Sequence, residues 1–254
     1  MKAMILAAGL GTRLRPLTND RPKALVTVAG RTMLEIALAR LRKFGVNEVI
    51  VNTHHYAEQI SQYLVANGNF GMRIELSHEE ELLDTGGGLK KSAWFFLNRK
   101  NPEEPSLAPF ILHNVDIIST IDIASMVQAH KKSGALATIA VQERKTSRYL
   151  LFNEKANELC GRIRGGDSQP ELVRSAASPQ PLAYSCIQVI SPRLLGKITE
   201  TGAFSIFDPE LRLAAQGEKV VAFRADGAYW RDLGKPESVE AATREIQAGI
   251  YAVN

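Results

Sequence analysis

The stretch that decides the fold is AMILAAGLGTRLRP at residues 3–16, followed by RPKAL at residues 21–25. Residues 3–8 are apolar and predict a buried β-strand, and Gly9 and Gly11 follow that strand directly. In an open α/β sheet, ligands bind beyond the carboxyl ends of the strands. A glycine loop there lets the backbone approach a ligand and point its N–H groups toward it. The stretch therefore predicts an α/β fold with a binding loop after its first strand.

Arg13 and Lys23 add positive charge to this loop, which suits a polyanion such as a triphosphate. A P-loop would need Gly-x-x-x-x-Gly-Lys-Ser/Thr, and the sequence contains no such string. A dinucleotide-binding fingerprint would need a third glycine where Leu14 stands. The two glycines alone also fit a tight strand-to-helix turn. The prediction of an anion site therefore depends on the basic residues.

The composition is that of a soluble globular protein, with 254 residues, 45% of them hydrophobic and 23% charged. The net charge of +4 is spread along the chain, so it fits small anionic substrates at least as well as nucleic acid. No stretch approaches the roughly 20 apolar residues of a membrane span. Cys160 and Cys186 form neither a metal motif nor a disulfide framework. We expect a cytoplasmic protein without nucleic-acid or membrane partners.

Strand and helix patterns alternate through the first half of the chain, which predicts a Rossmann-like, mostly parallel sheet flanked by helices. We predict one domain over residues 1–254, with a nucleotide-binding core (1–147), a small β-rich acceptor region (148–190) and a C-terminal part (191–254). Residues 165–181 are expected to form a loop or hairpin connection. The predicted strands are 3–8, 48–52, 72–77, 110–113, 136–141, 149–152, 159–162 and 182–190, with a last pair at 220–224 and 229–232. The predicted helices are 32–44, 56–66, 86–97, 121–132, 192–198, 207–215 and 236–248.

Two carboxylates stand at ends of predicted strands. Asp116 follows the strand 110–113, and Asp232 ends the strand 229–232. Each one alone fits a helix cap or a turn equally well. Together they suit Mg²⁺, a hard ion that keeps several waters and takes one or two protein carboxylates plus substrate phosphates.

A third cluster is HEEELLDTGGG at residues 78–88. Three glycines that open a helix would offer free N–H groups and the positive end of the helix dipole. The alternative is a flexible loop capped by Asp84 or Thr85. The neighbouring His54 and His55 point in opposite directions in an extended chain, so they cannot form a two-histidine metal site. One of them lines a base or ribose pocket, or both lie at the surface.

These motifs together resemble those of the sugar-1-phosphate nucleotidylyltransferases. That family carries Gly-x-Gly-Thr-Arg-x-x-Pro-x-Thr and then Pro-Lys-Pro-Leu, which residues 9–25 match except at Ala24. Its Asn-Gly-Asp is similar to residues 114–116, where Val115 replaces glycine. Its Trp-x-Asp-x-Gly-x-Pro is similar to residues 230–236. The resemblance covers most of the chain and is loosest from residue 152 to residue 183.

The resemblance implies that a nucleoside monophosphate passes from a nucleoside triphosphate to a sugar 1-phosphate, with release of pyrophosphate. Arg13 would neutralise the departing pyrophosphate, Lys23 would hold the α-phosphate, and Asp116 and Asp232 would bind Mg²⁺ as the cofactor. The nucleotide contacts it implies are Leu6, Ala8, Gly9, Gly11, Thr12, His78, Asp84, Thr85, Gly86 and Asn114.

The acceptor region departs from the family pattern. Leu150 and Cys186 stand where the family usually carries glycine, and the family's Glu-Lys-Pro motif has no counterpart. Lys145, Arg162 or Arg164 would then supply the charge that holds the sugar phosphate. The acceptor is expected to be a hexose or amino-sugar 1-phosphate, of the mannose type with GTP or of the N-acetylmuramate type with UTP.

Two other functions and the oligomeric state stay open at this point. A nucleotide-dependent oxidoreductase is disfavoured by Leu14. A non-catalytic sugar-nucleotide sensor would explain the altered acceptor region. A homodimer is compatible with the sequence, which carries no signal for or against it.

Overall fold

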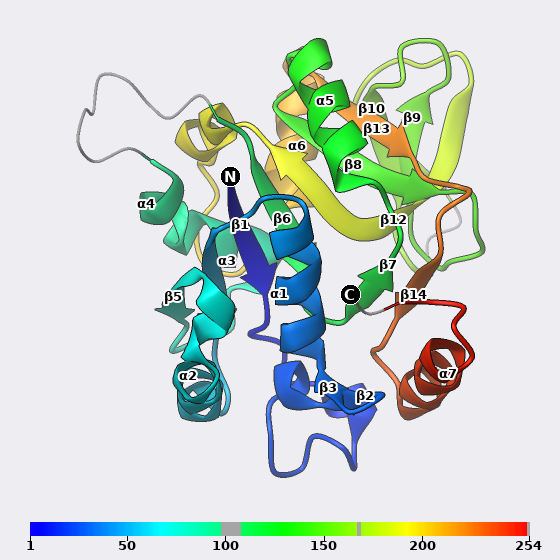
Figure 1. The fold of residues 1–254 in the computed structure, drawn as a ribbon. Coiled ribbons are helices and arrows are strands. Elements are labelled where there is room, and N and C mark those ends of the chain that lie inside the picture. The colour runs from blue at the N-terminus through cyan, green and yellow to red at the C-terminus, as the bar shows by residue number, and fades with distance from the viewer. Residues whose placement is uncertain (98–107, 167–168, 253–254) are drawn as a thin grey trace. The chain divides into compact units, whose positions relative to one another are not determined.

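The computed structural model describes residues 1–97, 108–166 and 169–252 (Figure 1). The chain divides into two compact units, each assembled from separate segments. Unit 1 consists of Met1–Leu83, Leu112–Ile121 and Ala228–Asn254, and unit 2 consists of Asp84–Ile111 and Asp122–Gly227. The strand β6 (Phe110–Asn114) begins in unit 2 and ends in unit 1.

Unit 1 takes its elements from the N-terminal part, a short middle segment and the C-terminal part of the chain. Its strands are β1 (Lys2–Leu6), β2 (Thr27–Val28), β3 (Arg31–Thr32), β4 (Glu48–Thr53), β5 (Arg73–His78), β7 (Ile117–Ser119) and β14 (Trp230–Asp232). Its α-helices are α1 (Met33–Lys43), α2 (Ala57–Ala66) and α7 (Pro236–Gln247). Its 3₁₀ helices are η1 (Thr12–Leu14), η2 (Lys23–Leu25) and η3 (Gly68–Gly71).

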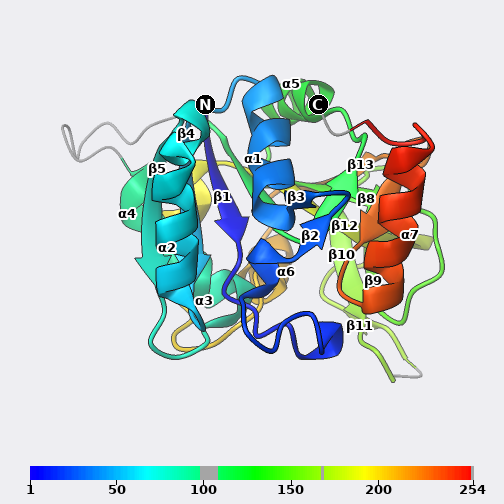
Figure 2. The same ribbon diagram turned by 60° about the horizontal axis from the view of Figure 1, so that its bottom comes forward.

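The sheet of unit 1 is parallel where β1, β4 and β5 pair. Met4 lies opposite Ile50 in the register of β1 and β4. β4 continues in parallel with β5. Figures 1 and 2 show α1 and α2 running along these strands. Burial under helices explains why β1 and the centre of β4 read as continuous apolar runs, as in other helix-covered parallel sheets.

Helix α1 illustrates how local sequence signals set the elements. The hydroxyl of Thr32 caps the helix by accepting a hydrogen bond from the Glu35 N–H at 3.1 Å. Leu34, Leu38 and Leu41 recur at helical spacing and are fully buried. Gly45 follows the helix with a positive φ of 76°. The predicted helix 32–44 is therefore confirmed within one residue at each end.

Unit 2 carries the longest strand among the described residues, β12 (Pro179–Ile190). Its other strands are β8 (Ala137–Gln142), β9 (Tyr149–Asn153), β10 (Leu159–Ile163), β11 (Glu171–Leu172) and β13 (Val220–Arg224). Its helices are α3 (Asp84–Lys91), α4 (Ala93–Phe96), α5 (Ile123–Ser133), α6 (Phe207–Ala215) and the 3₁₀ helix η4 (Pro192–Lys197).

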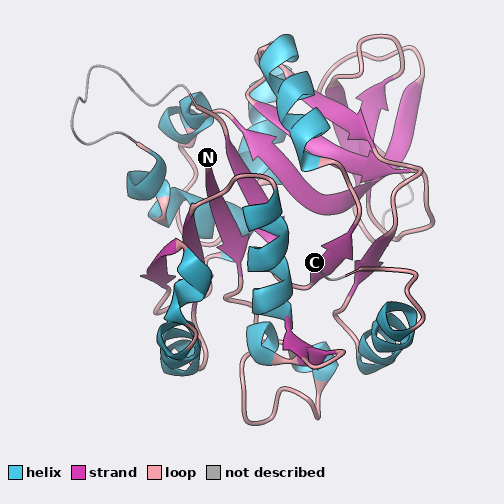
Figure 3. Ribbon diagram, viewed as in Figure 1, coloured by secondary structure: helices cyan, strands magenta, loops and turns pink. Residues whose placement is uncertain are grey.

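The strands of unit 2 are mostly antiparallel. β12 pairs antiparallel with both β8 and β9, and β10 lies between β9 and β11. β13 adds to the other side of β8 in parallel. The register of β12 against β8 shifts between Tyr184 and Gln188, which marks a β-bulge. Figure 3 shows these strands in magenta, with α5 and α6 beside them.

Three predictions about single elements need correction. The strands predicted as a last pair do not pair with each other, because β13 joins β8 in unit 2 and β14 joins β7 in unit 1. The predicted helix 86–97 is interrupted at Ser92, which separates α3 from α4 and buries its hydroxyl. The predicted helix 192–198 is a 3₁₀ helix, with Pro192 in its first turn.

The connection predicted at residues 165–181 contains the two-residue strand β11 and the first residues of β12, and residues 167–168 lie outside the described residues. The α/β class, with a mostly parallel sheet flanked by helices, is confirmed. The predicted single domain and its boundaries stay a prediction. Within the described ranges, no helix has the length and apolar character needed to cross a membrane.

Candidate active site

The glycine loop after β1 folds back on itself. Gly11 has a φ of 65°, a left-handed conformation that favours glycine. A side chain at this position would also lie 3.0 Å from Cγ2 of Thr18 and 3.1 Å from Cβ of Lys23. The Thr18 hydroxyl donates a hydrogen bond to the Gly11 carbonyl at 2.9 Å and closes the loop. Gly11 is thus required by both its backbone conformation and its surroundings.

The loop continues into the 3₁₀ helix η1, in which Leu14 is fully buried. Helix α2 and the residue before it, Tyr56, bind the backbone of the next loop residues. The hydroxyl of Tyr56 donates to the Asn19 carbonyl at 2.8 Å, and the Gln59 amide donates to the Asp20 carbonyl at 2.9 Å. Leu14, which stands where a dinucleotide-binding fingerprint would have its third glycine, is thus a core residue. It lies in a three-residue 3₁₀ helix and not at the start of a long helix.

Lys23 and Asp116 form an ion pair in unit 1. Lys23 lies at the start of η2, and Asp116 lies in the turn between β6 and β7. Their side chains are only 16% and 8% exposed. A carboxylate this poorly solvated depends on a compensating positive charge, which the Lys23 ammonium supplies.

Arg13 and Asp232 meet beside Gly234. A Cβ atom at Gly234 would lie 2.7 Å from Oδ1 of Asp232 and 3.0 Å from a terminal guanidinium nitrogen of Arg13. The Gly234 N–H donates to Oδ1 of Asp232 at 2.6 Å. Glycine at this position therefore lets a cation and a carboxylate approach the same point of the backbone.

The strands β7 and β14 bring the two carboxylates to one place. Asp232 lies opposite Ile117, the residue directly after Asp116. The Leu233 N–H donates to the Asp116 carbonyl at 2.8 Å. Unit 1 therefore assembles Arg13 and the Lys23–Asp116 pair around the last strand of the chain.

His113 and Asn114 are the last two residues of β6 and precede Asp116 in the chain. Oδ1 of Asn114 is buried and accepts no hydrogen bond within the described part of the chain. Nδ1 of His113 lies 2.7 Å from the Asn114 carbonyl. Burial, followed by the positive charge of Arg40, lowers the pKa of His113 to about 4, so its ring is neutral at pH 7.

The predicted nucleotide contacts divide between the two units. Unit 1 holds Leu6, Ala8, Gly9, Gly11, Thr12, His78 and Asn114, and unit 2 holds Asp84, Thr85 and Gly86.

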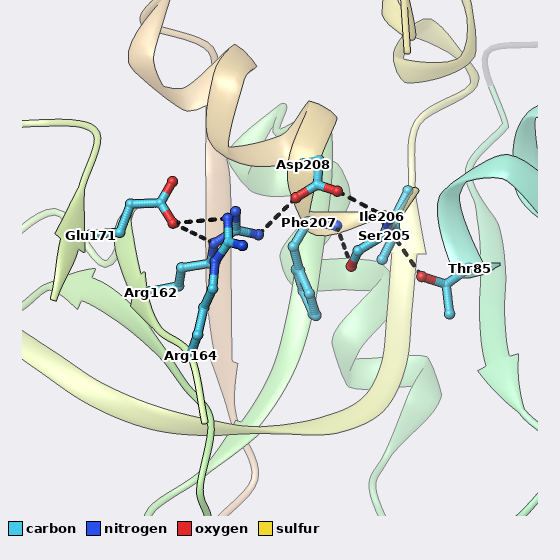
Figure 4. Close-up of polar contacts among 8 residues, drawn as sticks. All are labelled: Thr85, Arg162, Arg164, Glu171, Ser205, Ile206, Phe207 and Asp208. Atoms are coloured by element: carbon cyan, nitrogen blue, oxygen red, sulfur yellow. Dashed lines mark hydrogen bonds and ion pairs between the residues drawn. The ribbon is translucent and has the colours of Figure 1, made fainter. Parts of the chain in front are cut away.

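Two of the three glycines at the start of α3, Gly86 and Gly87, do not present free N–H groups, which corrects the expectation from sequence for these two. The N–H groups of Gly86 and Gly87 donate to the Phe204 carbonyl at 2.9 and 3.3 Å. A Cβ atom at Gly86 would lie 2.5 Å from the Phe204 ring. The hydroxyl of Thr85 accepts a hydrogen bond from the Ile206 N–H at 3.0 Å (Figure 4). Gly86 therefore permits close packing of α3 against the segment before α6.

The basic residues expected at the acceptor differ in their surroundings. Arg162 lies between Glu171 and Asp208, with N–O distances of 2.7 Å to each, and its side chain is 14% exposed (Figure 4). Arg164 forms an ion pair with Glu171 at 3.3 Å, and its side chain is 59% exposed. Lys145 is exposed. The charge of Arg162 is therefore already balanced by two acids.

The two departures from the family pattern both lie in unit 2. Leu150 is buried on β9. Cys186 lies in the β-bulge of β12 with a φ of 60°, a conformation that favours glycine. Cys160 is buried, and Cys186 is half-buried.

Comparison with known proteins identifies the chain. Residues 2–157, more than half of its length, match the family model described as nucleotidyl transferase. The chain belongs to the sugar-1-phosphate nucleotidylyltransferase family.

Two curated relatives of this nucleotidylyltransferase differ in how much of their own length is matched. The N-acetylmuramate alpha-1-phosphate uridylyltransferase of Caulobacter vibrioides is 33% identical, and the match covers 96% of both chains. The mannose-1-phosphate guanyltransferase beta-B of Xenopus laevis is 32% identical over 93% of this chain, which spans only 62% of that relative. The solved UDP-glucose pyrophosphorylase from Acinetobacter baumannii is similar in fold, with a TM-score of 0.79 at 17% identity over 99% of this chain and 95% of that one.

The carboxylates of this nucleotidylyltransferase suit a magnesium ion by their chemistry. Asp116 and Asp232 offer hard oxygen ligands, and Asp116 already pairs with one positive charge, the Lys23 ammonium. Within the described ranges, no group of three or more His, Cys, Asp or Glu residues is arranged to hold a metal. An ion bound here would therefore complete its coordination with phosphate oxygens and water.

Glu79 is a buried polar residue of this nucleotidylyltransferase that the sequence did not indicate. Glu79 begins a run of three glutamates and is buried, whereas Glu80 and Glu81 are exposed. Its carboxylate accepts a hydrogen bond from the side-chain amide of Asn52, near the end of β4. An acidic run usually indicates a solvated surface, so the run alone carried no signal for a buried member.

Proposed function

We propose that this nucleotidylyltransferase transfers uridylyl from UTP to N-acetylmuramate α-1-phosphate, giving the UDP-sugar and pyrophosphate. One observation carries this choice of substrates. The Caulobacter vibrioides relative with that name matches over 96% of its own length as well as 96% of this chain.

In the proposed reaction, an oxygen of the sugar 1-phosphate attacks the α-phosphorus of UTP in line with the leaving group. A new P–O bond forms, and the bond between the α-phosphorus and the oxygen bridging to the β-phosphate breaks. Pyrophosphate leaves with that electron pair. Such a transfer depends on alignment and charge neutralisation, so it needs no covalent intermediate.

Arg13 and Lys23 supply the fixed positive charge for this step. Lys23 holds the α-phosphate, and Arg13 neutralises charge that develops on the departing pyrophosphate. Asp116 and Asp232 would hold Mg²⁺, which when bound adds Lewis-acid stabilisation of the phosphate oxygens. The support for these roles is the assembly of all four residues in unit 1.

A second pair of substrates has its own support. The Xenopus laevis relative is named for mannose 1-phosphate and guanylyl transfer, and it matches 93% of this chain. GTP with mannose 1-phosphate is therefore the second candidate. The shorter share of that relative, 62%, makes it the weaker one.

The surroundings in which the protein works follow from these substrates. Nucleoside triphosphates and sugar 1-phosphates are small anions of the cytoplasm, and we propose that the protein acts there, without a nucleic-acid or membrane partner. A homodimer is the proposed alternative to a monomer, and sedimentation of the purified protein distinguishes the two.

The test is a pyrophosphate-release assay with UTP and GTP, each against N-acetylmuramate, N-acetylglucosamine, mannose and glucose 1-phosphates. The UTP and N-acetylmuramate α-1-phosphate pair should give the highest kcat/KM, and mass spectrometry should find the UDP-sugar. Exhaustive EDTA treatment should abolish turnover, and added Mg²⁺ should restore it. Pyrophosphate release from no pair of substrates, despite a folded protein, would contradict the proposal.

A further inference from the structure

A chain of hydrogen bonds runs through the interior of unit 1 and connects two predicted nucleotide-binding segments. The Ala7 N–H donates to Oδ1 of Asn52 at 2.7 Å. Nδ2 of Asn52 donates to Oε1 of Glu79, also at 2.7 Å. Oε2 of Glu79 accepts the Leu83 N–H at 3.0 Å. We call this sequence of contacts the Asn52–Glu79 relay.

Both side chains of the relay are removed from water. Asn52 is 3% exposed and Glu79 is 1% exposed. A buried carboxylate is costly unless its oxygens are hydrogen-bonded, and here each oxygen has an N–H partner. Glu79 therefore has a specific interior role that its exposed neighbours Glu80 and Glu81 do not share.

The direction of every hydrogen bond in the relay is determined by its ends. Both ends are backbone N–H groups, which can only donate. Asn52 must therefore turn its oxygen toward Ala7, which leaves its NH₂ group facing Glu79. Glu79 must accept at both oxygens, which a carboxylate can do and a glutamine amide cannot.

The backbone around Glu79 is fixed as well. The Glu79 N–H donates to the Thr53 carbonyl at 2.7 Å. The Glu79 carbonyl lies 2.8 Å from Nδ1 of His54. The carboxylate therefore cannot shift along β4 to find other partners.

The two ends of the relay lie next to residues with predicted nucleotide contacts. Ala7 directly precedes Ala8 and the glycine loop. Leu83 directly precedes Asp84 and Thr85. A change inside the relay would therefore move the loop that holds phosphate and release the segment that leads to Thr85.

We propose that Glu79 and Asn52 are positioning residues for the nucleoside triphosphate, a role that rests on the proposed function. They act through the Ala7 and Leu83 N–H groups and touch no reacting atom. Their contribution is to nucleotide affinity, so the relay governs the KM for the triphosphate more than kcat.

The experiment exchanges donor and acceptor within the pair. Glu79→Gln places an NH₂ group opposite another donor, and Asn52→Asp places a second carboxylate against Glu79. Either single change should weaken UTP binding about tenfold or more, as expected when a buried donor or charge loses its partner. The double variant, with the amide and the carboxylate exchanged, regains an acceptor for each N–H group and should bind UTP within about threefold of wild type.

Binding of UTP, and separately of GTP, is measured by titration calorimetry without sugar, and KM and kcat are measured with sugar 1-phosphate present. Glu80→Gln is the matched control, because it removes the same charge from an exposed neighbour. It should leave the Kd unchanged. The single variants should raise the KM for the triphosphate while kcat and the KM for the sugar 1-phosphate change little. Thermal unfolding shows that each variant is folded.

An unchanged Kd for Glu79→Gln would overturn the positioning role. So would a double variant that binds as weakly as the two single changes predict together. If Glu79→Gln does not fold, the double variant decides alone, because it recovers folding and UTP binding only when the hydrogen-bond directions matter. A wild-type protein that binds neither UTP nor GTP would overturn the proposed function, and the positioning role with it.

Discussion

The two units use their charged side chains in different ways. In unit 1, Lys23 faces Asp116, and Arg13 lies beside Asp232, so each cation is next to a predicted metal ligand. In unit 2, Arg162 lies between Glu171 on β11 and Asp208 on α6. A half-buried cation alone therefore does not mark a substrate site.

The partners of each cation decide what it can do. A carboxylate that takes up a metal ion no longer needs its lysine, and that lysine is then available to a phosphate. An arginine held by two acids on separate elements joins those elements and stays there. We therefore expect changes in unit 1 to lower turnover and changes in unit 2 to lower stability.

The largest effect is expected for Lys23→Ala. Loss of the ammonium removes the predicted α-phosphate contact and leaves Asp116 without its partner. We expect kcat/KM to fall on the order of 100-fold or more, as for the loss of other charge-stabilising groups. Steady-state pyrophosphate release checks this, with the exposed Lys43→Ala as a control that should match wild type. Turnover near the wild-type level would remove Lys23 from the site.

Asp232→Asn should come next. It keeps the shape of the side chain and its hydrogen bond from Gly234, but removes a charge from the proposed magnesium site. At a fixed Mg²⁺ concentration, turnover should fall about 50-fold to 100-fold, with part of the loss recovered at high Mg²⁺. A Mg²⁺ titration of the rate measures this. A half-saturating Mg²⁺ concentration equal to that of wild type would argue against Asp232 as a ligand.

Gly86→Ala tests whether Gly86 serves packing in unit 2. Its Cβ would lie 2.5 Å from the Phe204 ring and 2.9 Å from the Ser205 carbonyl carbon. We expect a loss of about 2–3 kcal/mol in the free energy of unfolding, the range for overpacking a close contact. Urea unfolding measures the loss. Gly196→Ala is the control, because no atom lies within 4 Å of its Cβ position, and equal stability of the two variants would refute the packing role.

Acid should lower the free energy of unfolding, because each unit contains one buried histidine that is neutral in the folded protein. Burial lowers the pKa of His113 and of His130 to about 4, with Arg40 and Arg193 adding to the respective shifts. The unfolded chain, with histidine pKa values near 6.5, binds protons that the folded protein does not, so stability falls as the pH drops from about 6.5 to 4. Each histidine should lower the free energy of unfolding by about 2 kcal/mol at pH 5 relative to pH 7.

Urea unfolding of wild type and His130→Gln at both pH values separates the two histidines. The variant should lose less stability between pH 7 and pH 5, because only His113 still contributes. An identical pH dependence in the two proteins would show that His130 titrates normally.

The smallest effect is expected for Arg162→Ala. The ion pairs with Glu171 and Asp208 are partly exposed, so we expect a loss of about 1 kcal/mol of stability. The UTP affinity should stay the same. Thermal unfolding, UTP titration and the KM for the sugar 1-phosphate are measured, with the more exposed Arg164→Ala for comparison. A variant with full stability but weaker binding of sugar 1-phosphate would place Arg162 at the acceptor instead.

The sequence predicted unit 1 well because its signals are local. The glycine loop and Asp116 each follow a predicted strand, and Asp232 ends one, whereas Lys23 is indicated by its place among the basic residues of the loop. The rule that ligands bind beyond strand ends accounts for the glycine loop and Asp116, whereas Asp232 reaches Asp116 through the antiparallel pairing of β14 with β7.

Contacts between distant segments could not be predicted in the same way. Gly86 stands in a run of glycines typical of a helix start with free N–H groups. Its N–H nevertheless donates to the carbonyl of Phe204, a residue distant in the sequence. Glu79 stands in an acidic run and still lies in the interior. Strands β13 and β14 follow one another along the chain but pair with strands of different units. In each case a tertiary partner overrides the local signal.

We propose that the Lys23–Asp116 pair takes part directly in magnesium-dependent nucleotidyl transfer. The most direct measurement is pyrophosphate release by Asp116→Asn with UTP, sugar 1-phosphate and Mg²⁺ at saturation, relative to wild type. We predict a rate lower by on the order of 100-fold or more, with the protein still folded. A rate near that of wild type would contradict the assignment of Asp116 to the reacting centre.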